Sequence, residues 1–215
     1  MRSSPEGGTG EDAIDQLEFF PDPQDADPRL SALSFVVTDL ETTGFSPGLN
    51  QIIEVAAVRL RGYEVEEEFS ALVDPGVEVP WQITQVTGIT SAMLRGQGRI
   101  QEVLPRYLRF LGSDCFVAHN APFDQKFLAY ESTRLGYPFA PASCCTLALA
   151  RRFLSGLRSR SLDALAEHLG IVNPARHRAL GDARATVEVL RCFLRQAEAA
   201  GVRRKSELFE YWKII

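Results

Sequence analysis

The sequence has no apolar run long enough to cross a membrane, which takes about 18 residues or more. It also has no apolar segment close to Met1 of the kind that forms a secretory signal. Its four cysteines contain no Cys-x-x-Cys pair, which excludes zinc fingers and disulfide scaffolds and favours reduced thiols. These absences predict a cytoplasmic protein with no membrane association.

Composition and charge favour one globular domain with short extensions. Of the 215 residues, 45% are hydrophobic and 24% are charged, as in ordinary globular domains. Residues 1–30 carry eight acids against two arginines and four prolines, so we expect a disordered acidic leader there. We expect the folded domain over residues 31–200 and a short C-terminal helix or tail over residues 201–215. Residues 126–215 carry fifteen bases against eight acids, which suits contact with phosphates.

Hydrophobic periodicity predicts an α/β sandwich built on a mixed sheet. Short β-branched or partly alternating runs indicate strands at residues 34–40, 52–60, 64–73 and 115–118. Short connections join the first three strands, which therefore pair antiparallel. Apolar residues at helical spacing indicate helices at residues 99–111, 123–135, 147–154, 162–169 and 180–200.

Two acids stand at the end of the first predicted strand, Asp39 and Glu41. Residues i and i+2 of a strand project from the same face, so these carboxylates lie together and repel each other unless a cation separates them. Hard oxygen ligands of this kind select Mg²⁺ or Mn²⁺. The pair alone does not decide between a metal site and two solvated loop acids.

Three further polar residues follow at the starts of predicted helices. Asp124 lies in the first turn after the strand at residues 115–118, and Asp182 opens the last long helix. Taken singly, each is explained by the attraction between a carboxylate and a helix N-terminus. His177 precedes Asp182 by five residues, on a loop. Together the set suits phosphodiester hydrolysis, in which carboxylates hold two metal ions and a near-neutral base takes a proton from water.

Three segments resemble the motifs of a known family. Residues 39–45 read Asp-Leu-Glu-Thr-Thr-Gly-Phe, residues 119–124 His-Asn-Ala-Pro-Phe-Asp, and residues 177–183 His-Arg-Ala-Leu-Gly-Asp-Ala. They resemble the three exonuclease motifs of the DEDD superfamily in its DEDDh branch. The similarity covers about residues 34–197. It points to the proofreading exonucleases of bacterial replicases: the DNA polymerase III epsilon subunit and the PolC exonuclease domain.

The resemblance implies an RNase H-like exonuclease fold, with a mixed five-stranded sheet and flanking helices. It implies 3′→5′ removal of 5′-mononucleotides with two Mg²⁺ ions, for which Mn²⁺ can substitute. His177 maps to the general base, because the tyrosine-type branch needs Tyr where Arg178 stands. The metal-binding acids map to Asp39, Glu41, Asp124 and Asp182.

The resemblance also implies a substrate and contacts to it. A nucleic acid with a 3′ end is expected, single-stranded DNA by preference, and a replicative polymerase is a candidate partner. Thr42 is expected beside the terminal nucleotide, and Thr87, Gly88 and Ile89 against its base and sugar. Asn120 and Phe123 complete the candidate substrate contacts, with core packing favoured for Phe123. Arg178 is either a phosphate contact or, as we favour, a solvated arginine.

Two other functions stay open at this point. The first is RNA trimming by an RNase T-like or oligoribonuclease-like exonuclease, whose chemistry is the same and whose sugar contacts differ. The second is a non-catalytic module that binds nucleic acid. The Thr-Thr-Gly after Glu41 favours the replicase group and hence DNA, and the presence of all five catalytic positions argues against the non-catalytic module.

One apolar segment stands alone in the acidic leader: Gln16, Leu17, Glu18, Phe19 and Phe20. It resembles the short peptide by which bacterial replication and repair proteins bind the sliding clamp. Phe19 departs from that pattern, which usually has leucine there. Leu17, Phe19 and Phe20 could fill an apolar pocket while Gln16 forms a hydrogen bond at its rim. The alternative is that the two phenylalanines pack on this chain's own surface.

Overall fold

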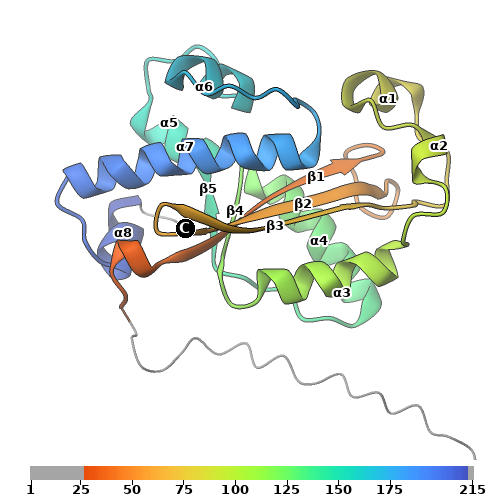
Figure 1. The fold of residues 1–215 in the computed structure, drawn as a ribbon, viewed down its shortest axis with the longest axis horizontal. Helices are drawn as coiled ribbons and strands as arrows, with labels where there is room; N and C mark the ends of the chain where they lie inside the picture. Colours follow the sequence, from red (N-terminus) through yellow and green to blue (C-terminus); the bar gives the residue numbers. More distant parts are fainter. Residues whose placement is uncertain (1–26, 213–215) are drawn as a thin grey trace, which may run out of the picture.

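The computed structural model describes residues 27–212 and contains one five-stranded sheet with helices on both faces (Figure 1). The strands are β1 (Ser34–Thr42), β2 (Ile52–Arg61), β3 (Glu64–Leu72), β4 (Cys115–Ala118) and β5 (Ser143–Cys145). A 3-10 turn, η1 (Leu30–Ala32), precedes them. The helices are α1 (Trp81–Thr87), α2 (Ser91–Leu94), α3 (Ile100–Leu111), α4 (Ala121–Leu135), α5 (Thr146–Phe153), α6 (Leu162–Leu169), α7 (Ala179–Ala199) and α8 (Lys205–Trp212).

The sheet is mixed, and its strand order is β3-β2-β1-β4-β5. β1 pairs antiparallel with β2, and β2 with β3, as the short connections predict. β1 pairs parallel with β4, and β4 with β5, across helical crossovers. The predicted mixed five-stranded sheet with flanking helices is therefore confirmed.

β1 lies in the middle of the sheet, and its two faces pack into two different cores. Phe35 and Val37 belong to the core under α7, together with Leu190 and Leu194 of that helix. Val36 and Leu40 belong to the core on the opposite face, which α3 and α4 cover. Because side chains alternate along a strand, Asp39 and Glu41 project to the α7 face.

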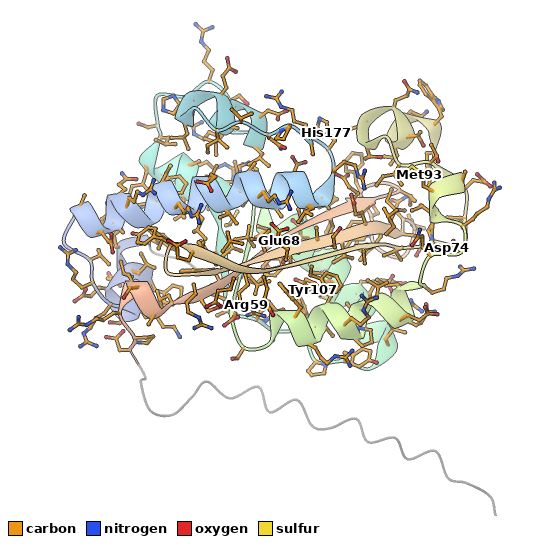
Figure 2. The ribbon with its side chains drawn as sticks, in the orientation of Figure 1. Arg59, Glu68, Asp74, Met93, Tyr107 and His177 are labelled. Carbon is orange, nitrogen blue, oxygen red and sulfur yellow. The ribbon has the colours of Figure 1, made fainter. Side chains whose placement is uncertain are left out.

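The opposite face of β1 is closed where the acids stand. The Thr38 and Tyr107 hydroxyls lie 2.9 Å apart in a buried hydrogen bond between β1 and α3. Figure 2 labels Tyr107, next to α3. Tyr107 is completely buried there. Only the α7 side of β1 can therefore hold an open polar site.

The sequence pattern does not predict three of the elements. β5 has three residues, too few for a periodic signal. α1 exposes Trp81 and Val86 to solvent, so it carries no apolar stripe that would reveal a helix. α2 is a single turn. α1 and α2 lie at the end of the sheet where β1 ends (Figure 1).

The described chain begins at Asp27, and its first residues pack against α8. The Lys205 amide donates a hydrogen bond to the Pro28 carbonyl at 2.9 Å, and Leu30 is 3% exposed in the core. Residues 27–30, assigned above to the leader, are thus packed in the structure. The Gln16–Phe20 segment lies outside the described residues. Within residues 27–212, no helix has the length and apolar character needed to span a bilayer.

Candidate active site

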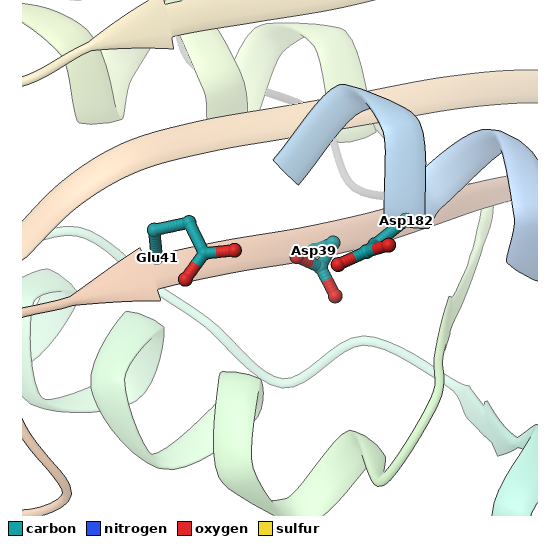
Figure 3. A group of neighbouring side chains, drawn as sticks. All are labelled: Asp39, Glu41 and Asp182. Carbon is teal, nitrogen blue, oxygen red and sulfur yellow. The ribbon is translucent and has the colours of Figure 1, made fainter. Parts of the chain in front are cut away.

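Three carboxylates from two distant segments meet where β1 ends. Ligand oxygens of Asp39, Glu41 and Asp182 all lie within 4.8 Å of one another (Figure 3). Asp39 and Glu41 share the α7 face of β1, and Asp182 stands in the first turn of α7, directly above it. All three side chains are half-buried. Sequence spacing predicts the first two as neighbours, the motif resemblance adds Asp182, and the fold brings all three together.

Asp124 lies outside this group of three, in the first turn of α4, and is 3% exposed. The recorded pairing of β1 with β4 runs from Phe35↔Cys115 to Val37↔Val117, so α4 begins where this ladder stops. The backbone N–H of Leu40 lowers the pKa of Asp124 and so partly offsets the effect of burial. The charges of Asp124 and Asp39 repel each other, so the fourth acid belongs to the same electrostatic site.

The acids are held in an environment that disfavours their charged forms. Burial, followed by repulsion from Asp124, Glu41 and Asp182, raises the pKa of Asp39 well above its usual range. Burial, with repulsion from Asp182 and Glu54, raises the pKa of Glu41 to about 8. Burial likewise raises the pKa values of Asp124 and Asp182. Such a cluster gains stability from a cation placed among its oxygens.

The loop before α7 fixes the Asp182 carboxylate. The Asn173 side-chain amide donates a hydrogen bond to its Oδ1 at 2.6 Å, and the His177 backbone N–H donates one to its Oδ2 at 3.0 Å. These bonds partly offset the effect of burial on the pKa of Asp182. Asn173 was not singled out in the sequence, because a lone asparagine beside a proline is typical of any loop.

His177 is exposed on this loop, at the N-terminal side of α7 (Figure 2). Its backbone has φ 57°, the left-handed region that residues other than glycine seldom occupy. Its charge interacts with that of Asp182. The predicted base therefore stands beside the acids but outside the buried group.

Arg178 forms an ion pair that neither of the two alternatives from the sequence included. Its Nε and Nη2 donate hydrogen bonds to the two carboxylate oxygens of Glu54, at 3.1 Å and 2.7 Å. Glu54 is 2% exposed and lies on β2, opposite Glu41 in the strand register. The sequence does not predict this ion pair, because only the fold brings the buried Glu54 to Arg178, whose side chain stays 39% exposed.

Two threonines expected at the substrate are bonded within their own turns. Thr42 Oγ1 donates a hydrogen bond to the Gly44 carbonyl at 2.6 Å. Thr87 Oγ1 donates one to the Ile83 carbonyl at 2.9 Å and accepts one from the Ile89 amide at 3.0 Å. These bonds order the chain at the end of β1 and at the end of α1.

The other expected substrate residues differ in exposure. Gly88 is exposed in a left-handed conformation, φ 70°, whereas the Ile89 side chain is completely buried. Ile89 can therefore reach a ligand only through its backbone. Asn120 is exposed, with φ 67°, just before α4. The half-buried Phe123 ring packs on Phe127, with centroids 5.3 Å apart, which fits the expected core role.

The donor set fits a hard divalent cation. The residues that meet are carboxylates only, with several oxygens in reach of one point, and Mg²⁺ and Mn²⁺ prefer such oxygen ligands. Asp39, Glu41 and Asp182 would hold the ion, with Asp124 next to them. The loop histidine adds a group that can accept a proton from water.

Comparisons with known proteins agree with this chemistry. A family model described as exonuclease, of the RNase T type, matches residues 36–190. The DNA polymerase III subunit epsilon of Aquifex aeolicus is 45% identical over 157 residues, which are 73% of this chain and 78% of that protein. The PolC-type DNA polymerase III of Clostridium perfringens is 43% identical over 157 residues. That match covers 73% of this chain but 11% of the polymerase, so the chain spans about a tenth of that relative's length.

A solved structure shares the fold. Exonuclease X in complex with 5′ overhanging duplex DNA matches with a TM-score of 0.63 and 30% sequence identity. The match covers 76% of this chain and 93% of exonuclease X. The helices and the mixed sheet described above are therefore those of an exonuclease fold.

Proposed function

The chain belongs to the RNase T exonuclease family, that of the DEDD exonucleases, and on this premise we propose that it is a 3′→5′ exonuclease that releases 5′-mononucleotides from DNA ends. The family uses divalent metal ions, and we propose Mg²⁺, two ions per site, with Mn²⁺ as a substitute. The physiological role that we propose is proofreading or repair, as for the epsilon subunit. RNA trimming is the alternative.

The observation that carries the proposal is the meeting of Asp39, Glu41 and Asp182 within 4.8 Å, with Asp124 outside this group of three. In our proposal these four acids hold the metal ions. Bound Mg²⁺ supplies activation of water and stabilisation of the negative charge that develops on the phosphate. The protein's own contribution is to keep four carboxylates together in a buried position that each alone would avoid.

His177 is the general base in this proposal. Its loop places it beside Asp182, and its exposure leaves the imidazole accessible to water and to a substrate phosphate. A neutral imidazole accepts the proton of the attacking water, and histidine is suited to this near neutral pH.

The substrate in this proposal is a single-stranded DNA 3′ end. The half-buried acids lie at the end of β1, and an unpaired strand can bring the last phosphodiester before its 3′ end to them. The terminal nucleotide would lie among Thr42, Thr87, Gly88, Ile89, Asn120 and Phe123. DNA rather than RNA is supported by the relatives, which are DNA polymerase III subunits and an exonuclease solved with DNA.

The test uses matched DNA and RNA oligonucleotides with a 5′ label, with Mg²⁺ or with EDTA. We expect stepwise shortening from the 3′ end, 5′-mononucleotide products, faster turnover of DNA than of RNA, and no turnover in EDTA. An Asp182→Asn protein, purified in parallel, controls for contaminating nucleases. Absence of metal-dependent release would refute the proposal, and faster RNA turnover would assign the chain to the RNA-trimming alternative.

We further propose that Gln16, Leu17, Phe19 and Phe20 bind a sliding clamp, which would hold the nuclease near DNA ends alongside a replicative polymerase. The discriminating measurement is titration of a peptide covering residues 14–22 against the clamp. The control peptide carries Gln16→Ala, Leu17→Ala and Phe20→Ala. Tighter binding of the natural peptide supports this partner, and equal or absent binding by both excludes it.

A further inference from the structure

We propose that Glu54 and Arg178 form a positioning pair that fixes the backbone of His177 and the start of α7, and so sets the general base against the acidic cluster. The inference rests on the proposed function, because it assigns a role in the same reaction. Neither residue is one of the metal-binding acids or the base. Both act through the chain segment that carries them.

Glu54 is a buried acceptor for one short segment. Its carboxylate is 2% exposed and accepts three hydrogen bonds. Two come from Arg178, from Nε at 3.1 Å and from Nη2 at 2.7 Å, and the third comes from the Ala179 backbone N–H at 2.9 Å. Ala179 is the first residue of α7, so its N–H is one of the donors that a helix start leaves unpaired. Glu54 therefore caps α7 from the neighbouring strand β2.

The strand register connects this cap to the acids. Glu54 on β2 lies opposite Glu41 on β1, so the β1–β2 ladder fixes the Glu54 backbone relative to the cluster. From Glu54 the hydrogen bonds lead to Arg178 and Ala179, which directly follow His177. The start of α7 is thereby tied to the same ladder that presents Asp39 and Glu41.

A second set of hydrogen bonds closes the segment on itself. The Asp182 backbone N–H donates to the Arg178 carbonyl at 3.0 Å. The His177 backbone N–H donates to the Asp182 carboxylate at 3.0 Å. The backbone of His177 thus lies between its hydrogen bond to the Asp182 carboxylate and the next residue, Arg178, which is bonded to Glu54.

The backbone of His177 needs this support. A residue with a Cβ at φ 57° is disfavoured and persists only where surrounding contacts fix it. The neighbouring Arg178 has φ −126° and ψ 125°, so the chain changes from left-handed to extended within one step. Loss of the two hydrogen bonds between Arg178 and Glu54 removes the side-chain contact of Arg178, the residue that directly follows His177.

The geometry also separates positioning from phosphate binding. Arg178 uses two of its guanidinium nitrogens on Glu54, and its charge opposes the effect of Glu54 repulsion on the pKa of Glu41. Loss of an arginine that contacts phosphate would lower the affinity for substrate. Loss of an arginine that positions the base lowers turnover instead.

The chain offers a matched control on the same helix. Arg184 of α7 forms a two-nitrogen ion pair with Glu68 of β3, with Nε 2.8 Å and Nη2 2.5 Å from the two carboxylate oxygens. Arg184 is exposed, and its helix position is two residues beyond Asp182. Loss of the Arg184–Glu68 pair therefore shows the effect of removing a two-nitrogen arginine ion pair from α7 at a position that is not next to His177.

The experiment compares Arg178→Lys, Arg178→Met, Glu54→Gln and the control Arg184→Met, each in the full chain and in a His177→Ala background. We expect both Arg178 variants and Glu54→Gln to lower kcat about 10- to 100-fold, the usual cost of losing a group that orients a catalytic residue, with little change in KM. In the His177→Ala background the same changes should cost almost nothing more. Arg178→Lys keeps the positive charge beside Glu54, so it still allows the test if Arg178→Met fails to fold.

Hydrogen exchange provides a readout that is independent of activity. We expect the Ala179 and Asp182 amides to exchange faster in the Arg178 variants and unchanged in Arg184→Met. An increase in KM with constant kcat, or an equal loss of turnover in the presence and absence of His177, would overturn the inference. Wild-type protein without exonuclease activity would instead refute the proposed function, whereas unprotected Ala179 and Asp182 amides in wild type would refute the positioning pair alone.

Discussion

The two halves of β1 face the same helix but contain opposite chemistry. In the first half, Phe35 and Val37 are buried under α7 and belong to its apolar core. In the second half, Asp39 and Glu41 continue the same row of side chains, and their burial raises the pKa of each carboxyl group. The candidate site therefore continues the same buried row of side chains. Burial of the apolar side chains stabilises the fold, whereas burial of the carboxyl groups destabilises the metal-free protein.

The largest expected effect concerns the second half of β1. Asp39→Asn or Asp182→Asn should lower metal-dependent turnover on the order of 10⁴-fold, because each removes an acid that holds the ion, and bound metal supplies several kcal/mol of charge stabilisation. The melting temperature of the metal-free protein should stay equal or rise, because crowded carboxylates repel one another. Assays in excess Mg²⁺ and melting curves in EDTA measure the two effects. Turnover at the wild-type level in either variant would contradict the assignment.

The next effect concerns the base. His177→Ala should lower kcat about 10²- to 10⁴-fold, the range usual for loss of a general base, with a much smaller change in substrate affinity. The acid limb of the pH–rate profile should disappear, since histidine protonation produces it. Single-turnover rates across the pH range provide the measurement. A variant that keeps the wild-type pH–rate profile would show that another group accepts the proton.

Replacement in the first half of β1 should have the reverse effect. Phe35→Ala should destabilise the fold by about 3–5 kcal/mol, because it leaves a cavity in the core under α7. Turnover per folded molecule should stay near wild type, since Phe35 lies away from the acidic cluster. Urea unfolding and active-site titration separate the two quantities. If Phe35→Ala lowered turnover without lowering stability, the first half of β1 would not be purely structural, which would contradict the comparison.

The last expected effect is a pH dependence of stability, which leaves turnover in Mg²⁺ unchanged. The pKa of Glu41 is raised from its ordinary value to about 8, so the folded protein binds more protons than the unfolded chain between about pH 5 and pH 8. Stability in EDTA should therefore be greatest at the acid end of this window and should fall as the pH rises through it. Mg²⁺ should remove most of the slope. A Glu41→Gln protein with an unchanged slope in EDTA would contradict this origin.

Much of the fold and part of the site follow from sequence patterns. Spacing by two places Asp39 and Glu41 on one face of a strand, and apolar periodicity gives α3, α6 and α7 within a few residues of their bounds. The motif resemblance adds Asp182, which the structure brings to the same point. Asp124 follows its strand as expected and lies outside the group of three.

The rest depends on contacts that no local pattern encodes. Glu54 sits in a run of apolar β2 residues, and nothing near it in sequence reveals that Arg178 and Ala179 will reach its carboxylate. Nothing in the sequence indicates a role for Asn173 either, because only the folded loop brings it to Asp182. β5 and α1 are missed because one is too short and the other exposes its apolar side chains.

The most direct test of a metal site at the end of β1 is Mn²⁺ binding measured by electron paramagnetic resonance. Wild-type protein should bind about two ions per chain at saturation, as two-metal hydrolysis requires. His177→Ala and Phe35→Ala proteins should keep this binding, whereas Asp39→Asn should lose most of it, because Asp39 lies within reach of Glu41 and Asp182 and the charge of Asp124 also acts on it. Equal Mn²⁺ binding by wild type and Asp39→Asn would contradict the account.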